Sequence, residues 1–137
     1  MSMFKVKLSA QCAGLLLMAS LPLFAHHTFS SEFDANKPMT LTGTVTKVDW
    51  SDPHAYIYVS AKDESGKTQE WKLETASPEY LAKHGMKEDT FKTGEKVTVN
   101  AYRATTEPNV GSARVVKTAN GKSMQVADPS EDRGPAK

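Results

Sequence analysis

The chain has 137 residues, with 17 Lys and Arg against 16 Asp and Glu, so its formal charge is only +1. This balance argues against a nucleic-acid-binding protein, because that binding depends on clustered basic residues that displace counterions. The length suits one domain, and a domain of this size can be stable without disulfides.

Residues 1–25 have the pattern of a cleavable secretory signal peptide. Lys5 and Lys7 form a positive start, an apolar run follows, and Ala25 is a small residue suited to the position before the cut. The alternative, an uncleaved membrane anchor, is disfavoured because polar residues and a proline interrupt the run. We therefore expect a periplasmic or secreted protein that begins at His26 and keeps no stable membrane anchor.

Cleavage would also change the chemistry of the chain. It would remove two lysines and no acid, so the formal charge would move from +1 to −1. It would remove Cys12, the only cysteine, and the mature protein would then have no disulfide although export would permit one.

The mature chain reads as an extended N-terminal segment, residues 26–38, followed by a β domain over 39–126. The first strand, 39–50, alternates apolar and polar residues, but the alternation slips near Thr46 and Lys47. A slip of one residue is typical of a β-bulge, which bends a strand. Strands 55–62 and 68–74 then form a hairpin around a short turn.

A short helix is predicted at 78–84. Ser77 is suited to the N-cap, Pro78 to the first helical position, and Gly85 to the position just after the helix. Strands follow at 96–103 and 113–118, and Asn120-Gly121 predicts a tight turn into a last short strand. Residues 127–137 are rich in charge, Pro and Gly, which predicts a disordered tail.

Three strands, a short helix and two or three further strands are the order of the OB-fold. This five-stranded barrel binds ligands on strands 2 and 3 and on the flanking loops. We therefore predict a mainly β protein, with a small OB-like antiparallel barrel and one short helix. A bulged first strand suits a sheet that must curl.

Several short segments resemble a family of small exported bacterial proteins, domain of unknown function 6152. The N-terminal segments are Ala25 to Phe29, Phe33-Asp34, Leu41 to Val45 with Trp50, and Asp52-Pro53-His54; the later ones are Trp71, Ser77-Pro78 with Leu81 and Gly85, and Gly94 with Val97 and Val99. Met86 stands where such proteins tend to carry a tryptophan. The resemblance covers about residues 25–126 and implies export and one compact domain, with no activity assigned.

The histidines suggest a metal site. Cleavage would give His26 a free α-amine beside its imidazole, and His27 would add a second imidazole. A square-planar nitrogen set favours Cu(II) or Ni(II). His54 lies in the first loop between strands and could join them if residues 26–34 fold over the binding face. The alternative is a frayed terminus with His54 as a turn residue. His84 is better explained by the last turn of the helix, where an imidazolium complements the helix dipole.

An aromatic face is the second candidate. Tyr56 and Tyr58 share one side of the strand 55–62, and Trp50 lies just before it. OB-folds use such rings to stack ligands, although these aromatics, with Trp71 and Tyr102, are better explained as core or near-core residues of the barrel.

The sequence favours a binding domain over an enzyme. It contains no Gly-x-Ser-x-Gly motif and no His-x-x-x-His pair, so no catalytic residue is predicted. The leading hypothesis is an exported domain that binds copper through His26, His27 and His54. The alternative is a metal-free module that binds a small molecule, a glycan or a protein through Trp50, Tyr56 and Tyr58.

Overall fold

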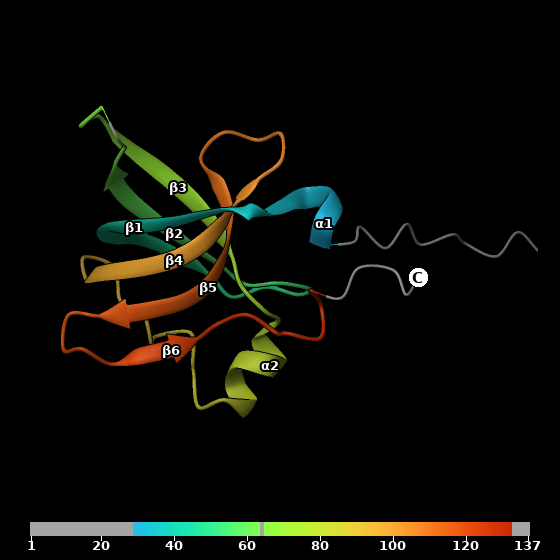
Figure 1. Ribbon diagram of the computed structural model, residues 1–137. Coiled ribbons are helices and arrows are strands. Elements are labelled where there is room, and N and C mark those ends of the chain that lie inside the picture. The colour runs from blue at the N-terminus through green and yellow to red at the C-terminus, as the bar shows by residue number, and fades with distance from the viewer. Residues whose placement is uncertain (1–28, 64, 133–137) are drawn as a thin grey trace, which may run out of the picture.

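The computed structural model describes residues 29–63 and 65–132, and its elements form one mainly β arrangement (Figure 1). In chain order they are α1 (Phe29–Glu32), β1 (Phe33–Asp49), β2 (Tyr56–Lys62), β3 (Thr68–Glu74), α2 (Pro78–Lys83), β4 (Lys96–Ala104), β5 (Val110–Thr118) and β6 (Ser123–Gln125). The predicted mainly β class is confirmed. In the described residues, no helix is long and apolar enough to cross a membrane.

The sheet has the strand order β3-β2-β1-β4-β5-β6, with antiparallel neighbours throughout. A further pairing joins β3 to β5 in parallel, where Leu73 lies opposite Gly111. The inward-facing side chains, among them Val45, Ile57 and Leu73, form a single buried core. The pairing of β3 with β5 therefore links one edge strand of the sheet order back to a strand beyond its middle.

The long β1 pairs with two neighbours in succession. Its first part pairs with β4 from Phe33 to Thr44, and its last part pairs with β2 from Gly43 onward. The β1–β2 register shifts between Val45 and Lys47, which is where the alternation of the sequence slips. The predicted bulge is confirmed, and it lets one strand turn from one partner to the other.

The start of β1 differs from the prediction. An extended segment was expected up to residue 38, but residues 29–32 are helical and β1 begins at Phe33. The β1–β4 register is irregular between Asp34 and Pro38, and Pro38 cannot donate a backbone hydrogen bond. This irregularity hides the alternation on which the prediction depended.

The helix α2 begins and ends as its sequence predicts. The Ser77 side chain accepts a hydrogen bond from the backbone N–H of Tyr80, at 3.1 Å. Gly85 has a φ of +81°, a left-handed conformation that glycine adopts without strain, and its N–H bonds to the carbonyl of Ala82. In Figure 1, α2 lies close to the segment that follows β6.

Residues 127–132 were expected to begin a disordered tail, but the structure places them against the sheet. Ala127 is only 4% exposed, and the side chains of Glu131 and Asp132 pair with His54 and Arg114. These partners are distant in the sequence, so local composition could not reveal them. Residues 133–137 lie outside the described part of the chain.

Gly43 gives a direct test of the double pairing of β1. A Cβ at this position would lie 2.0 Å from the backbone oxygen of Ser60 on β2. Gly43→Ala should therefore lower the free energy of unfolding by about 2 to 3 kcal/mol, because backbone cannot move aside as a side chain can. Urea unfolding followed by circular dichroism measures the change. Thr42→Ala, at the exposed neighbouring position, is the control and should cost much less; equal losses would contradict this account.

Candidate functional site

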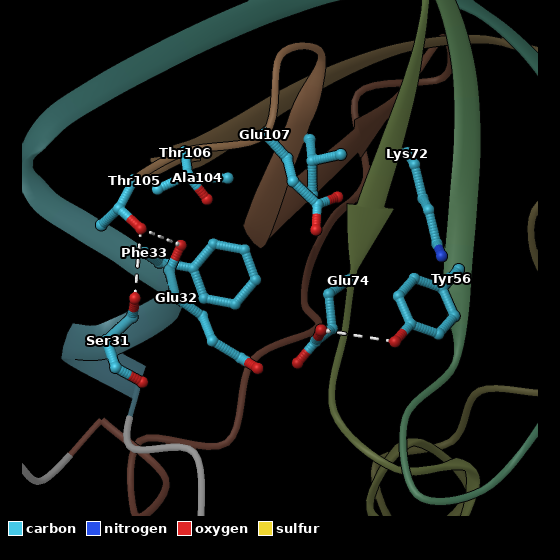
Figure 2. A pocket seen from close by; sticks show the side chains of 11 residues that line it. Ser31, Glu32, Phe33, Tyr56, Lys72, Glu74, Ala104, Thr105, Thr106 and Glu107 are labelled. Carbon is cyan, nitrogen blue, oxygen red and sulfur yellow. Dashed lines mark hydrogen bonds between the residues drawn. The ribbon is translucent and has the colours of Figure 1, made fainter.

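A cavity of about 330 Å³ lies where α1, the start of β2, the end of β3 and the β4–β5 loop meet (Figure 2). Its lining combines two aromatic rings with charged and hydroxyl side chains. The lining residues are Ser31, Glu32, Phe33, Tyr56, Lys72, Glu74, Ala104, Thr105, Thr106, Glu107 and Val110. A concave site with an aromatic surface and a few polar groups is typical of small-ligand binding.

The β2–β3 hairpin places one wall of this cavity. Its register sets Tyr56 opposite Glu74 and Tyr58 opposite Lys72, all on the outer side of the sheet. The Tyr56 hydroxyl donates to Glu74 Oε2 at 3.4 Å, and the Lys72 ammonium lies 4.4 Å from the centre of the Tyr56 ring. This wall therefore presents an aromatic face that already holds a cation.

Thr105 fixes the opposite wall. Its side-chain hydroxyl lies 3.1 Å from the carbonyl oxygen of Ser31 and 3.3 Å from that of Glu32, and its backbone N–H donates to the Glu32 carbonyl at 2.9 Å. These bonds hold α1 against the loop that follows β4, so the cavity has two walls from segments far apart in the sequence.

Negative charge predominates around the cavity. The carboxylates of Glu32, Glu74 and Glu107 come from three different elements, and Lys72 is the one cation among the residues that line the cavity. Figure 2 shows the Glu32 and Glu74 side chains extending toward the same space. Burial and the nearby charge of Glu74 raise the pKa of Tyr56 to about 12, and Glu32 contributes. The phenol is therefore neutral at physiological pH and can donate a hydrogen bond.

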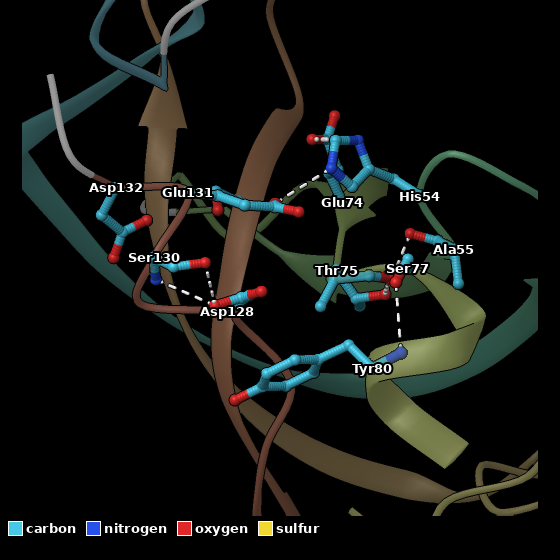
Figure 3. A network of polar contacts seen from close by, with 12 residues as sticks. His54, Ala55, Glu74, Thr75, Ser77, Tyr80, Asp128, Ser130, Glu131 and Asp132 are labelled. Atoms are coloured by element: carbon cyan, nitrogen blue, oxygen red, sulfur yellow. Dashed lines mark hydrogen bonds and ion pairs between the residues drawn. The ribbon is translucent and has the colours of Figure 1, made fainter. Parts of the chain in front are cut away.

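His54 lies directly behind Glu74 (Figure 3). Its Nδ1 is 3.0 Å from Glu74 Oε1, and its Nε2 is 3.0 Å from Glu131 Oε2. The hydrogen bond to Glu74 and the charges of both carboxylates raise the pKa of His54 from 6.5 to about 9, although partial burial opposes the rise. His54 is thus an imidazolium at neutral pH, and both ring nitrogens donate.

This arrangement bears on the predicted copper site. An imidazolium cannot coordinate a metal, because coordination needs the neutral ring. Within residues 29–63 and 65–132, no group of three or more His, Cys, Asp or Glu side chains is placed to hold a metal ion. His26 and His27 lie outside the described residues, so the N-terminal chelate stays a prediction, and His54 could join it only by releasing its proton and its bonds to Glu74 and Glu131.

The other aromatic and histidine candidates occupy different places. Tyr56 lines the cavity, Tyr58 lies beside it under the Lys47 ammonium at 5.2 Å, and Trp50 packs against the core. Trp71 is buried, as the core alternative supposed. His84 Nδ1 donates a hydrogen bond to the Tyr80 carbonyl at 2.8 Å at the end of α2, which agrees with its predicted structural role.

Met86, the position where the resembling proteins tend to carry a tryptophan, is 3% exposed and part of the core. It therefore belongs to the interior and not to a ligand surface.

Sequence reasoning missed the charged half of the cavity. Pairing the predicted hairpin strands around their turn would have set Tyr56 opposite Glu74 and Tyr58 opposite Lys72, so that signal was present. Glu32 and Glu107 carried no comparable signal, because they reach the cavity from a short helix and from a loop.

Comparison with known proteins identifies a family, but no individual relative. The model of a family of unknown function, DUF6152, matches residues 13–113, most of the chain. No curated protein and no solved structure matches it significantly.

The His54 ion pairs predict a pH dependence of stability. Because the pKa of His54 is higher in the folded protein than its usual 6.5, its contribution is complete below pH 6.5 and is lost as pH rises through 9. We expect the free energy of unfolding to fall by about 1 to 2 kcal/mol over this range, after allowance for solvent screening. Urea unfolding at several pH values measures it. His54→Gln should abolish this fall and His84→Gln should keep it; a fall that survives in His54→Gln would refute the assignment.

The copper prediction now concerns His26 and His27. If signal cleavage frees the His26 amine, which intact mass of the exported protein checks, Cu(II) should bind tightly to the mature chain. One extra residue before His26 should weaken binding greatly, because the basic amine becomes a peptide nitrogen. His54→Gln should leave the affinity unchanged. Calorimetric titration of the three proteins decides, and equal affinity with and without the extra residue would reject the chelate.

Proposed function

The chain belongs to the DUF6152 family, and since that family has no assigned function, we propose from the cavity itself that this protein is an exported binding domain for a small, positively charged organic ligand. The observation that carries the proposal is the cavity of about 330 Å³, whose aromatic and acidic lining comes from separate elements. This is the metal-free alternative of the two hypotheses that the sequence allowed, with the ligand's charge now specified.

An OB-like barrel is part of this proposal. The pairings run from β1 to β2, β3, β5, β4 and back to β1, with α2 between β3 and β4, and this order supports an OB-like closure. Such barrels bind ligands on strands 2 and 3 and on the loops between strands 1 and 2 and between strands 4 and 5. Here Tyr56 and Glu74 come from β2 and β3, Glu107 from the β4–β5 loop, and His54 from the β1–β2 loop.

The aromatic ring of Tyr56 and the negative charge of the cavity both favour a positively charged ligand. An ammonium group over a tyrosine ring is attracted to its face, and Lys72 already occupies the Tyr56 ring in this manner. A ligand ammonium at this position would gain the carboxylate of Glu74 as a hydrogen-bonding partner. Lys72 would then have to move aside, so its side chain competes with the ligand.

Export supports a ligand encountered outside the cytoplasm. The proposal rests on the N-terminal pattern of residues 1–25, with two lysines, an apolar run and Ala25. We propose a periplasmic or secreted location, and no catalytic role for the cavity.

The sign of the ligand's charge can be tested with three aromatic probes of similar size. Benzylamine, benzyl alcohol and benzoate differ mainly in charge, and shifts of backbone amide signals in NMR titrations report binding and its location. We expect benzylamine to bind most tightly, Glu74→Gln to weaken it about fivefold, and Lys72→Gln to strengthen it. Nonspecific attraction would also respond in opposite directions to these two charge changes, so a control variant outside the cavity is needed to distinguish the two.

Glu70→Gln is the matched control for this experiment. Glu70 is an exposed residue on β3 that does not line the cavity, and its replacement changes the net charge by the same amount as Glu74→Gln. It should leave benzylamine binding unchanged. Tightest binding of benzoate, or equal binding of all three probes, would overturn the proposal.

A further inference from the structure

The segment that follows β6, residues 127–132, lies outside the cavity, where it borders a separate small space together with Phe29, Glu74 and Arg114. Its base is anchored by backbone bonds: the Ala76 N–H donates to the Val126 carbonyl at 2.7 Å, and the Val126 N–H donates to that of Arg114 at 3.0 Å. A small pocket between this segment and the sheet has a volume of about 20 Å³, room for about one water molecule. The segment is therefore closely packed against the fold.

One attachment of the segment leads to the β3 wall of the cavity. Glu131 bonds to His54, and the other ring nitrogen of His54 bonds to Glu74 Oε1. Glu74 uses its second oxygen for the Tyr56 hydroxyl. Through His54, the segment therefore fixes the orientation of the carboxylate that faces the ligand.

The other attachment leads to the α1 wall. Asp132 forms a two-pronged ion pair with Arg114, whose Nη1 donates to Asp132 Oδ1 at 2.9 Å. The Arg114 guanidinium lies over the rings of Phe29 and Tyr102, at 5.3 and 5.4 Å. Phe29 is the first residue of α1, and α1 carries Ser31 and Glu32 into the cavity.

We propose that residues 127–132 form a strap that joins the two walls of the cavity, with His54 and Arg114 as positioning residues. Neither of these side chains lines the cavity. His54 acts through Glu74, and Arg114 acts through Phe29. The strap sets the distance between the walls, so closing it and binding a ligand favour each other, and by reciprocity each must stabilise the other equally.

The statement that ligand binding and closing of the strap favour each other rests on the proposed function. The statement that the strap couples the two walls does not. Two amides report the coupling in the absence of ligand. The Val126 N–H reports the base of the strap, and the Thr105 N–H, bonded to the Glu32 carbonyl at 2.9 Å, reports the docking of α1. Hydrogen exchange of both can be followed by NMR in the full mature chain.

Glu131→Gln should loosen the strap at its β3 attachment. We expect exchange at Val126 to rise about tenfold, because a hydrogen bond to a charged group is lost. We also expect faster exchange at Thr105, although Glu131 does not contact it. Asp132→Asn should raise exchange at Thr105 and alter the ¹⁵N signals of the His54 ring. Glu88→Gln, at an exposed position, should change none of these.

The outcomes separate the two proposals. If Glu131→Gln leaves exchange at Thr105 unchanged while the His54 signals shift, the walls are not coupled and the strap is refuted. In the wild-type chain, benzylamine should slow exchange at Val126, and Glu131→Gln should remove this effect while the fold, judged by amide chemical shifts, persists. If benzylamine does not bind at all, the proposed function fails. The coupling of the walls is then decided independently, by the exchange at Thr105 measured without ligand.

Discussion

Within the single sheet, the strand β1 pairs with β4 along its first part and with β2 along its last part, and the arrangement of the other elements depends on this double pairing. Gly43 and Thr44 are paired with β4 and with β2 at once. The β2 backbone can approach β1 this closely only because Gly43 has no side chain, since a Cβ would collide with the Ser60 carbonyl. The bulge that follows turns the strand toward β2. As a result, the start of β1 is free to extend along β4 and to carry α1 toward the ends of β2 and β3.

The cavity depends on a balance of charge that no single residue provides. Three carboxylates in one small space would repel each other, and two cations reduce this cost: the His54 imidazolium, which does not line the cavity, and the Lys72 ammonium, which lies over the Tyr56 ring inside it. The two cations differ in freedom. His54 is fixed by two hydrogen bonds, whereas Lys72 is an exposed, flexible side chain with three rotatable donors. The first holds the Glu74 carboxylate in place, and the second is the one that can leave the Tyr56 ring, as the proposed ligand requires.

Local patterns in the sequence predicted the helix and most of the strands well. Features that depend on contacts between residues far apart in the chain could not be predicted in this way. The alternation of residues 55–62, the Ser77-Pro78 helix start and the slip near Thr46 each depend on neighbours in the chain, and the structure agrees with them. The early start of β1 was missed because its irregular pairing near Pro38 breaks the alternation. The role of His54 was missed for a different reason.

His54 was predicted as a third metal ligand because it lies in the first loop between strands, beside the expected binding face, where it could join His26 and His27. Its real neighbours are carboxylates, one 20 residues away and one 77 residues away. Glu131 lies in a stretch whose composition predicts disorder, so nothing local indicates that it folds back. The sequence could therefore suggest that His54 lies near the binding face, but its protonation state depends on a contact that only the tertiary structure provides.

The cavity and the strap draw on different parts of the chain. All residues that line the cavity lie between Ser31 and Val110, inside the range 13–113 that matches the family. Arg114, Glu131 and Asp132, which fasten the strap, lie beyond that range. A relative with the same cavity residues and different residues at positions 131 and 132 would therefore separate the two without any engineered substitution. If such a relative binds the ligand although its walls are not coupled, the cavity alone is sufficient for binding, and the strap only modifies it.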